Sequence, residues 1–161
     1  MTMVTMTPQP FDSAILGRPV YRAELEEVVQ IPMLEESIPD NAALVSARVR
    51  PDWVNVMEIT QFRKIEHLVS LERPLLASDG GGSPDSVRLG GTNDAEACAD
   101  IARRSFSFDR YHVDPMIDNA AADESKRAWA RNNLSGRGDA AFIAEFRGQI
   151  IGFNLCLRGE D

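Results

Sequence analysis

The segment AFIAEFRGQIIGFNLCL, residues 141–157, decides the expected fold of this chain. Two apolar runs, 141–144 and 149–157, flank a turn at residues 146–148 that contains a glycine. Aromatic and β-branched runs on either side of such a turn are typical of two antiparallel strands. The sequence therefore predicts a β-hairpin here.

A short strand and two helices are expected ahead of this hairpin. Residues 87–89 are a strand candidate, and any of residues 92–94 can cap a helix that ends near Ser105. A second helix is expected over residues 118–134, with alanines on one face and charged side chains on a largely solvated face. The order strand, helix, helix, strand, strand places residues 87–161 in a mixed α/β (α+β) fold class.

Residues 11–76 alternate between short strand-like and short helical runs. The strand candidates are residues 19–23, 43–49 and 67–71, and a short helix is expected after Pro51 because proline fits a first helical turn. This alternation predicts a small N-terminal α/β region.

Two segments lack the periodicity that would bury one face. Residues 1–10 are small, polar and proline-containing, which predicts a disordered leader. Residues 77–86 include three consecutive glycines and predict a flexible linker between the two regions.

The composition argues against several classes of protein. A formal net charge of -8 disfavours binding to nucleic acid, because that affinity comes largely from Lys and Arg on phosphates. No apolar run approaches the roughly 20 residues that cross a bilayer, and the N-terminus has no signal-peptide pattern. We therefore expect a cytoplasmic protein with neither a nucleic-acid nor a membrane partner.

The two cysteines lie in different patterns. Cys98 belongs to an alanine-rich helical run and Cys156 to an apolar strand-like run. Such placement suits two buried, reduced thiols better than a disulfide framework or a metal site, so no metal site is expected.

Several stretches are similar to one enzyme family. Residues 104–115 read RSFSFDRYHVDP, and residues 126–133 read KRAWARNN. With the hairpin and with residues 11–19 and 61–66, they make most of the chain resemble a GNAT-type acetyltransferase, in particular the subgroup that contains TDP-fucosamine acetyltransferase. In that subgroup a glycine precedes the phenylalanine that matches this region, whereas here Gln61 stands in the glycine's place.

The resemblance implies a fold and an activity. The fold is a GNAT-like central mixed, mainly antiparallel sheet with flanking helices, of which residues 87–161 would form the first half. The activity is N-acetyl transfer from acetyl-CoA to a primary amine, in this subgroup on a nucleotide-linked amino sugar, without a metal or a covalent intermediate. The catalytic groups of the family lie mainly on later strands, so no catalytic residue is assigned.

The family's loop for the CoA pyrophosphate is not found in this sequence. That loop reads Arg or Gln, two spacers, Gly, a spacer, Gly or Ala, and it opens a helix whose N–H groups hold the phosphates. The glycines at 80–82 precede a proline, and those at 136–138 lead into a strand. We therefore expect this chain alone to lack acetyl-CoA binding and to be inactive, as a fragment, a truncated gene or a diverged half-domain would be.

Four residues between the two expected helices are candidates for contact with the amine acceptor, because the resemblance places this region beside the acceptor site. They are Arg110, Tyr111, His112 and Asp114. His112 can act as a base near neutral pH or can orient its loop by hydrogen bonding. Arg110 can attract a diphosphate or belong to a solvated loop, and Asp114 can simply end the loop before Pro115.

A noncatalytic alternative stays open. A GNAT sheet cut after its third strand leaves an unpaired edge with apolar surface, which favours association. In this second hypothesis the chain is a GNAT-derived module that forms a homo-oligomer, or pairs with a complementing chain, through its exposed sheet edge.

Overall fold

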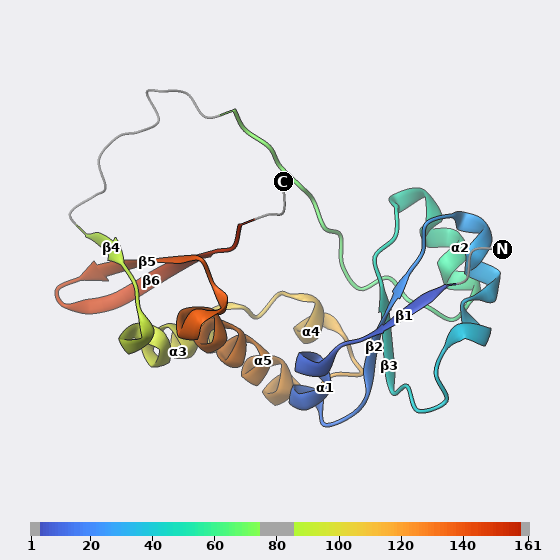
Figure 1. Cartoon of the computed structure of the whole chain (residues 1–161), viewed down its shortest axis with the longest axis horizontal. Coiled ribbons are helices and arrows are strands. Elements are labelled where there is room, and N and C mark those ends of the chain that lie inside the picture. The colour runs from blue at the N-terminus through green and yellow to red at the C-terminus, as the bar shows by residue number, and fades with distance from the viewer. Residues whose placement is uncertain (1–3, 75–85, 159–161) are drawn as a thin grey trace. The chain divides into compact units, whose positions relative to one another are not determined.

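The computed structural model of the chain describes residues 4–74 and 86–158. It has two compact units, Met1–Glu66 and His67–Asp161. Each contains a three-stranded sheet and short helices (Figure 1), so the predicted α/β class is confirmed. The expected linker 77–86 lies outside the described residues except for Ser86.

The first unit is built on a sheet with the strand order β1-β2-β3. Strand β1 pairs antiparallel with β2, and β2 pairs parallel with β3. The strands and α-helices of this unit are β1 (Thr5–Pro8), α1 (Pro10–Leu16), β2 (Val20–Glu24), β3 (Leu44–Ala47) and α2 (Val54–Ile59). Three short 3₁₀ turns complete it: Val28–Met33, Glu35–Ser37 and Pro51–Trp53.

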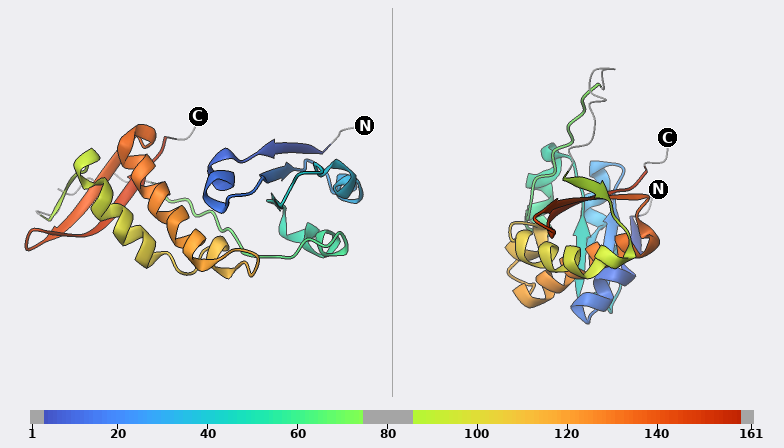
Figure 2. Two further views of the ribbon diagram at one scale, coloured as in Figure 1. Left: turned by 90° about the horizontal axis from the view of Figure 1, so that it is seen from below. Right: turned by 90° about the vertical axis from the view of Figure 1, so that its left-hand side faces the viewer.

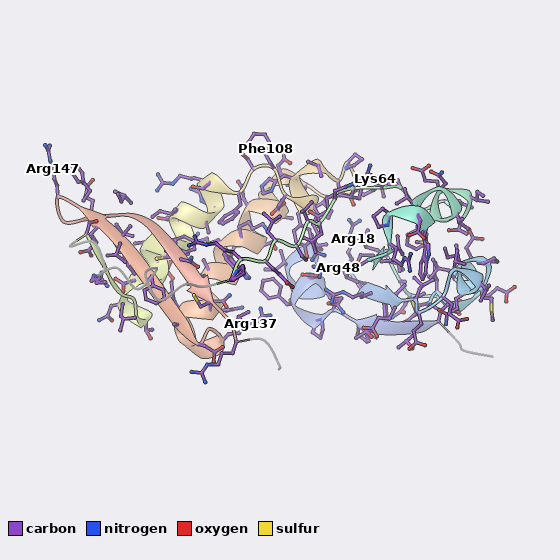
Figure 3. The ribbon with its side chains drawn as sticks, turned by 90° about the horizontal axis from the view of Figure 1, so that it is seen from above. Arg18, Arg48, Lys64, Phe108, Arg137 and Arg147 are labelled. Carbon is purple, nitrogen blue, oxygen red and sulfur yellow. The ribbon has the colours of Figure 1, made fainter. Side chains whose placement is uncertain are left out.

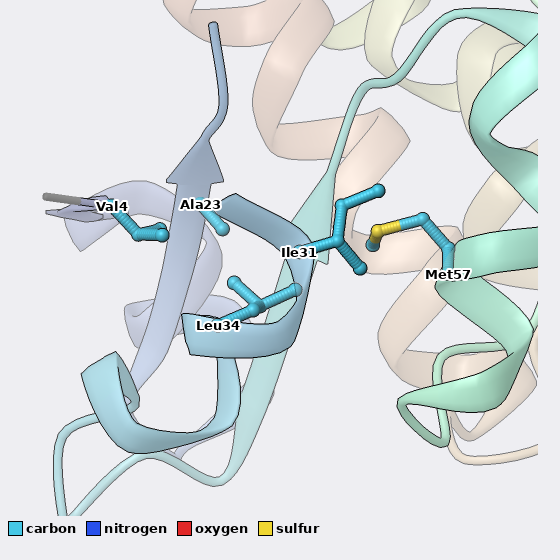
Figure 4. Packing of buried hydrophobic residues seen from close by; sticks show 5 residues of the cluster. All are labelled: Val4, Ala23, Ile31, Leu34 and Met57. Carbon is cyan, nitrogen blue, oxygen red and sulfur yellow. The ribbon is translucent and has the colours of Figure 1, made fainter. Parts of the chain in front are cut away.

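The core of the first unit joins the sheet to the 3₁₀ turns and α2 (Figure 4). Ile31 and Leu34 are fully buried, and Val4, Ala23 and Met57 close the same cluster. The strands at 19–23 and 43–49 and the helical turn after Pro51 are confirmed, with slightly different ends.

Two predictions for this region are wrong. Part of the expected leader is ordered, because β1 pairs along β2 from Thr5 opposite Glu24 and Val4 is buried in the core. The expected strand at 67–71 is absent from the described structure, where those residues have no regular secondary structure and Leu71 is 90% exposed. A strand needs a neighbour for its backbone N–H and C=O groups, and these apolar side chains have no core to enter.

The second unit has the predicted order of strand, helices and hairpin. Its strands form an antiparallel sheet in the order β4-β5-β6. Its elements are β4 (Val87–Leu89), α3 (Ala95–Ser105), α4 (Arg110–Val113), α5 (Asn119–Asn132), β5 (Ala140–Phe146) and β6 (Gln149–Cys156). Among the described residues of this unit, three short elements are additions to the predicted order: a 3₁₀ turn at Thr92–Asp94, the single-turn helix α4 and a π-helical turn at Asn133–Arg137.

The hairpin turn has the geometry that tight β-hairpins prefer. Arg147 and Gly148 both have positive φ, 52° and 76°. Two consecutive residues in the left-handed region match the twist of the strands on either side. In Figure 3 Arg147 projects outward from this turn.

Helices α3 and α5 lie side by side along one face of the β4-β5-β6 sheet (Figures 1 and 2). Cys98 of α3 and Ile143 of β5 are fully buried between helix and sheet. Arg131 of α5 joins the helices by donating to Glu96 of α3, with Nε 2.6 Å from Oε1.

The cysteine prediction is met in part. Both thiols are free. Cys98 is fully buried, and desolvation raises its pKa to about 11, whereas Cys156 is only half-buried. Cys98 is therefore a packing residue, as its alanine-rich helix indicates.

Candidate functional site

Asp109 organises the segment that contains the candidate residues. It is the N-cap of α4, and its Oδ1 accepts hydrogen bonds from the backbone N–H groups of Tyr111 at 2.9 Å and His112 at 3.1 Å. Aspartate is favoured here because the first N–H groups of a helix have no partner inside it. The cap folds residues 110–113 into one helical turn.

His112 joins α4 to α5. Its Nδ1 lies 2.9 Å from Asp109 Oδ1, and its Nε2 lies 3.1 Å from Asp123 Oδ1. The side chain is 8% exposed. Both ring nitrogens therefore lie within hydrogen-bond distance of a carboxylate oxygen. These two contacts favour the loop-orienting reading of His112 over the general-base reading.

Lys126 completes this network from α5. Its ammonium forms an ion pair with Asp109 Oδ2 and lies 5.6 Å from the ring centroids of both Phe106 and Tyr111. The expectation that the charged side chains of this helix are largely solvated is wrong for Lys126, which is 19% exposed. We call Asp109, His112, Asp123 and Lys126 the α4–α5 network.

Arg110 and Tyr111 contact each other. The Arg110 guanidinium donates to the Tyr111 hydroxyl at 2.6 Å and stacks with its carbon 4.6 Å from the ring centroid. Tyr111 is 8% exposed. Arg110 is therefore held against a buried ring, which limits its reach toward a diphosphate.

Asp114 closes the turn that leads into α5. Its Oδ1 accepts from the Met116 N–H at 2.9 Å, and its backbone carbonyl accepts from the Ile117 N–H at 3.0 Å. The residue is 8% exposed. These contacts favour the turn-forming reading of Asp114 over contact with an acceptor.

Large apolar side chains are exposed in the same segment. Phe108 is 92% exposed and projects outward (Figure 3). Phe106, Val113 and Met116 are exposed by 39%, 48% and 56%. We call these four side chains the apolar rim. Exposed apolar groups beside a network of charges are common at ligand and partner sites.

A turn with two glycines, Gly90 and Gly91, precedes α3. Gly90 and Gly91 precede Thr92, as a phosphate loop would require, but the Gly91 N–H donates to Asp94 Oδ2 at 2.9 Å. Asp94 in turn accepts from Arg88 at 2.7 Å, and both contacts hold the pKa of the Asp94 carboxyl at about 2. The Gly91 N–H at this helix start is thus paired with the chain's own Asp94 carboxylate.

Three of the four predicted site residues, Arg110, Tyr111 and His112, lie together on α4, and Asp114 follows directly. Sequence reasoning missed Asp109, Asp123 and Lys126 as their partners. The available signal was weak: aspartate at position 109 suits a helix cap, and positions 123 and 126 lie on one face of a helix at a spacing of three.

No helix in the described part of the chain is long and apolar enough to cross a membrane. Within the described residues, no group of three or more His, Cys, Asp or Glu side chains is arranged to hold a metal ion.

Comparison with known proteins gives one partial match. No protein-family model matches this chain. Over 68 residues, 42% of the chain, it is 40% identical to the spore coat polysaccharide biosynthesis protein SpsD of Bacillus subtilis (strain 168). The match spans 24% of that protein's length. The chain is therefore similar, over part of its length, to part of a polysaccharide biosynthesis protein.

Proposed function

We propose that this chain is the acceptor-binding portion of a sugar-modifying enzyme, an N-acetyltransferase that moves acetyl from acetyl-CoA to a primary amine on a nucleotide-linked sugar. The similarity to a polysaccharide biosynthesis protein carries the sugar part of this proposal. The strand, helix, helix, hairpin order of the second unit supports the acetyltransferase part through the family resemblance.

The chemistry divides between recognising the acceptor and activating the thioester. A primary amine is protonated in water and must lose a proton before it attacks, and the tetrahedral oxyanion then needs a hydrogen-bond donor. In this proposal the segment between α3 and α5 supplies recognition: the exposed apolar rim contacts the acceptor, and the buried Tyr111 and His112 hold the segment in place. Acetyl-CoA is the proposed cosubstrate, and we expect it not to bind this chain alone because the glycine turn at α3 is filled by Asp94.

A binding panel tests the class of acceptor. Nucleotide-linked amino sugars, lysine peptides and a polyamine are titrated into the isotope-labelled chain and followed by NMR. The proposal predicts saturable shifts in residues 106–126 with the amino sugars at lower concentrations than with the other amines. Preferential binding of the peptides or the polyamine would contradict a sugar acceptor.

A second candidate function rests on the sheet. Among the described strands β6 pairs only with β5, and Leu89, Phe142 and Ile151 of this sheet are exposed by 71%, 42% and 61%. An unpaired edge beside apolar surface favours association with a second copy. In this reading the chain is a noncatalytic pairing module. Light scattering on the chain and on Ile151→Lys decides it: a dimer that Ile151→Lys dissociates favours the module, and a monomer at every concentration rejects it.

A further inference from the structure

One carboxylate oxygen of the α4–α5 network is left for a ligand. Asp123 uses Oδ1 for the His112 ring, and its side chain is 39% exposed. Within residues 4–74 and 86–158, no hydrogen bond or ion pair engages Asp123 Oδ2. Asp109 differs, because it is 17% exposed and its two oxygens are engaged by His112 and Lys126.

The direction of the Asp123 carboxylate is fixed before any ligand arrives. His112 holds it through Nε2 and is itself held at Nδ1 by Asp109, which also caps α4. A side chain already restrained loses less conformational entropy when it binds. The same restraint sets where the second oxygen points.

The residues around Asp123 favour a ligand that has a positively charged group attached to a compact, partly apolar ring. The neighbouring cation Lys126 is paired with Asp109, and the next one along the helix, Arg127, is directed to Glu96. His112 joins Asp123 to α4, on which Val113 of the apolar rim is exposed, and the exposed Phe108 lies just before this helix. A hexose ring with a protonated amine offers both a charge for the carboxylate and a C–H face for the rim.

We propose that Asp123 binds the ammonium group of the acceptor through Oδ2, with His112 and Asp109 as positioning residues behind it; this inference rests on the proposed function. It names a residue on α5, whereas the predicted site residues all lie on α4 or directly after it. No covalent step is involved. The bound cation forms an ion pair and a charge-assisted hydrogen bond, and transfer of its proton belongs to a later step.

The test uses the full chain and two simple probes. Glucosamine carries the cation, and glucose has a hydroxyl in its place. The readout is the Nε2 ¹⁵N resonance of the His112 ring, which is sensitive to a change in the contact between Nε2 and Asp123. Three variants are compared with the unaltered chain: Asp123→Asn keeps an oxygen for His112 without the charge, Asp123→Glu keeps the charge, and Glu124→Gln removes a neighbouring exposed charge of α5 that does not contact His112.

The inference predicts saturable His112 shifts with glucosamine and none with glucose. Asp123→Asn should weaken glucosamine binding at least about tenfold, while Glu124→Gln leaves it unchanged and Asp123→Glu partly restores it. Equal weakening by Asp123→Asn and Glu124→Gln would overturn the assignment, because general charge would then explain the binding. Binding of glucosamine without a His112 shift would also overturn it.

The two proposals fail in different ways. If nucleotide-linked amino sugars bind but Asp123→Asn binds them as tightly as the unaltered chain, the ammonium lies elsewhere and only the role of Asp123 is rejected. If no amino sugar binds in the wider panel, the proposed function fails and the role of Asp123 fails with it. Thermal melting of Asp123→Asn checks that the variant is folded before either result is interpreted.

Discussion

His112 makes two side-chain contacts that a surface histidine does not make. Its ring bridges Asp109 and Asp123, so truncation removes two side-chain hydrogen bonds and leaves Asp109 with the backbone N–H groups of α4 and Lys126 as its partners. We expect His112→Ala to lower the free energy of unfolding by about 1–3 kcal/mol. Urea denaturation measures it, with the exposed His67 changed to Ala as the matched control. Equal stability of the two variants would show that the bridge contributes nothing.

The sequence located His112 and its neighbours but not their partners. The sequence from Asp109 to Pro115 predicts a polar segment between two helices, and in the structure this segment lies between α3 and α5. The pairing of His112 with Asp123 depends on the path of the loop between α4 and α5, and no local pattern encodes that path. At Gln61 the local sequence comparison did carry structural information. The resemblance expects a glycine at this position, and Gln61 has a φ of 64°, in the region that glycine adopts without strain.

At the scale of single elements, β4 is held against β5 by a close approach at Gly90. A Cβ added there would lie 2.7 Å from Ile143 Cγ1 and 3.2 Å from Ala141 Cβ. We expect Gly90→Ala to destabilise the chain by about 1–3 kcal/mol, because the buried Ile143 has little room to move. Gly91→Ala is the control, since a Cβ there meets nothing within 4 Å. Thermal unfolding of both variants makes the comparison, and equal melting temperatures would contradict this packing.

The Asp94 carboxylate, which lies close to Gly90 in the chain, predicts that the free energy of unfolding depends on pH. The Asp94 pKa is lowered to about 2, first by hydrogen bonds from Arg88 and then by the Gly91 N–H. Because the folded-state pKa is depressed, the stabilisation is full above the ordinary aspartate pKa and is lost as the pH falls toward 2. The unfolding free energy should fall over that acidic range by less in Asp94→Asn than in the unaltered chain. Asp100→Asn, on the same helix, should keep the full slope; a loss of slope there instead would reject this role of Asp94.

Elements with strong local patterns were predictable, and elements that depend on distant partners were not. The hairpin has a glycine in its turn, α5 has the N-cap Asp118, and both α3 and α5 have helical spacing, so their positions followed from sequence. Strand β1 is four residues long and exists because β2 offers an edge. The apolar residues at 67–71 had the right composition for a strand but no such edge.

At the scale of the whole molecule, the chain combines two units with separate cores. The division between Glu66 and His67 falls before the glycine-rich segment that marks the boundary in the sequence. The candidate residues, the α4–α5 network and the apolar rim all belong to the second unit. The first unit supplies none of them, so its own contribution to function is a separate question from recognition of the acceptor amine.

Two dissociation constants check whether the chain recognises a sugar amine, as proposed. Calorimetry compares a nucleotide-linked sugar that carries a primary amine with the same compound carrying a hydroxyl at that position. A charge-assisted contact predicts that the amine binds at least about tenfold more tightly, because a hydrogen bond to a charged group contributes about 1.5–3 kcal/mol. Equal dissociation constants, or no saturable binding of either compound, would contradict the claim.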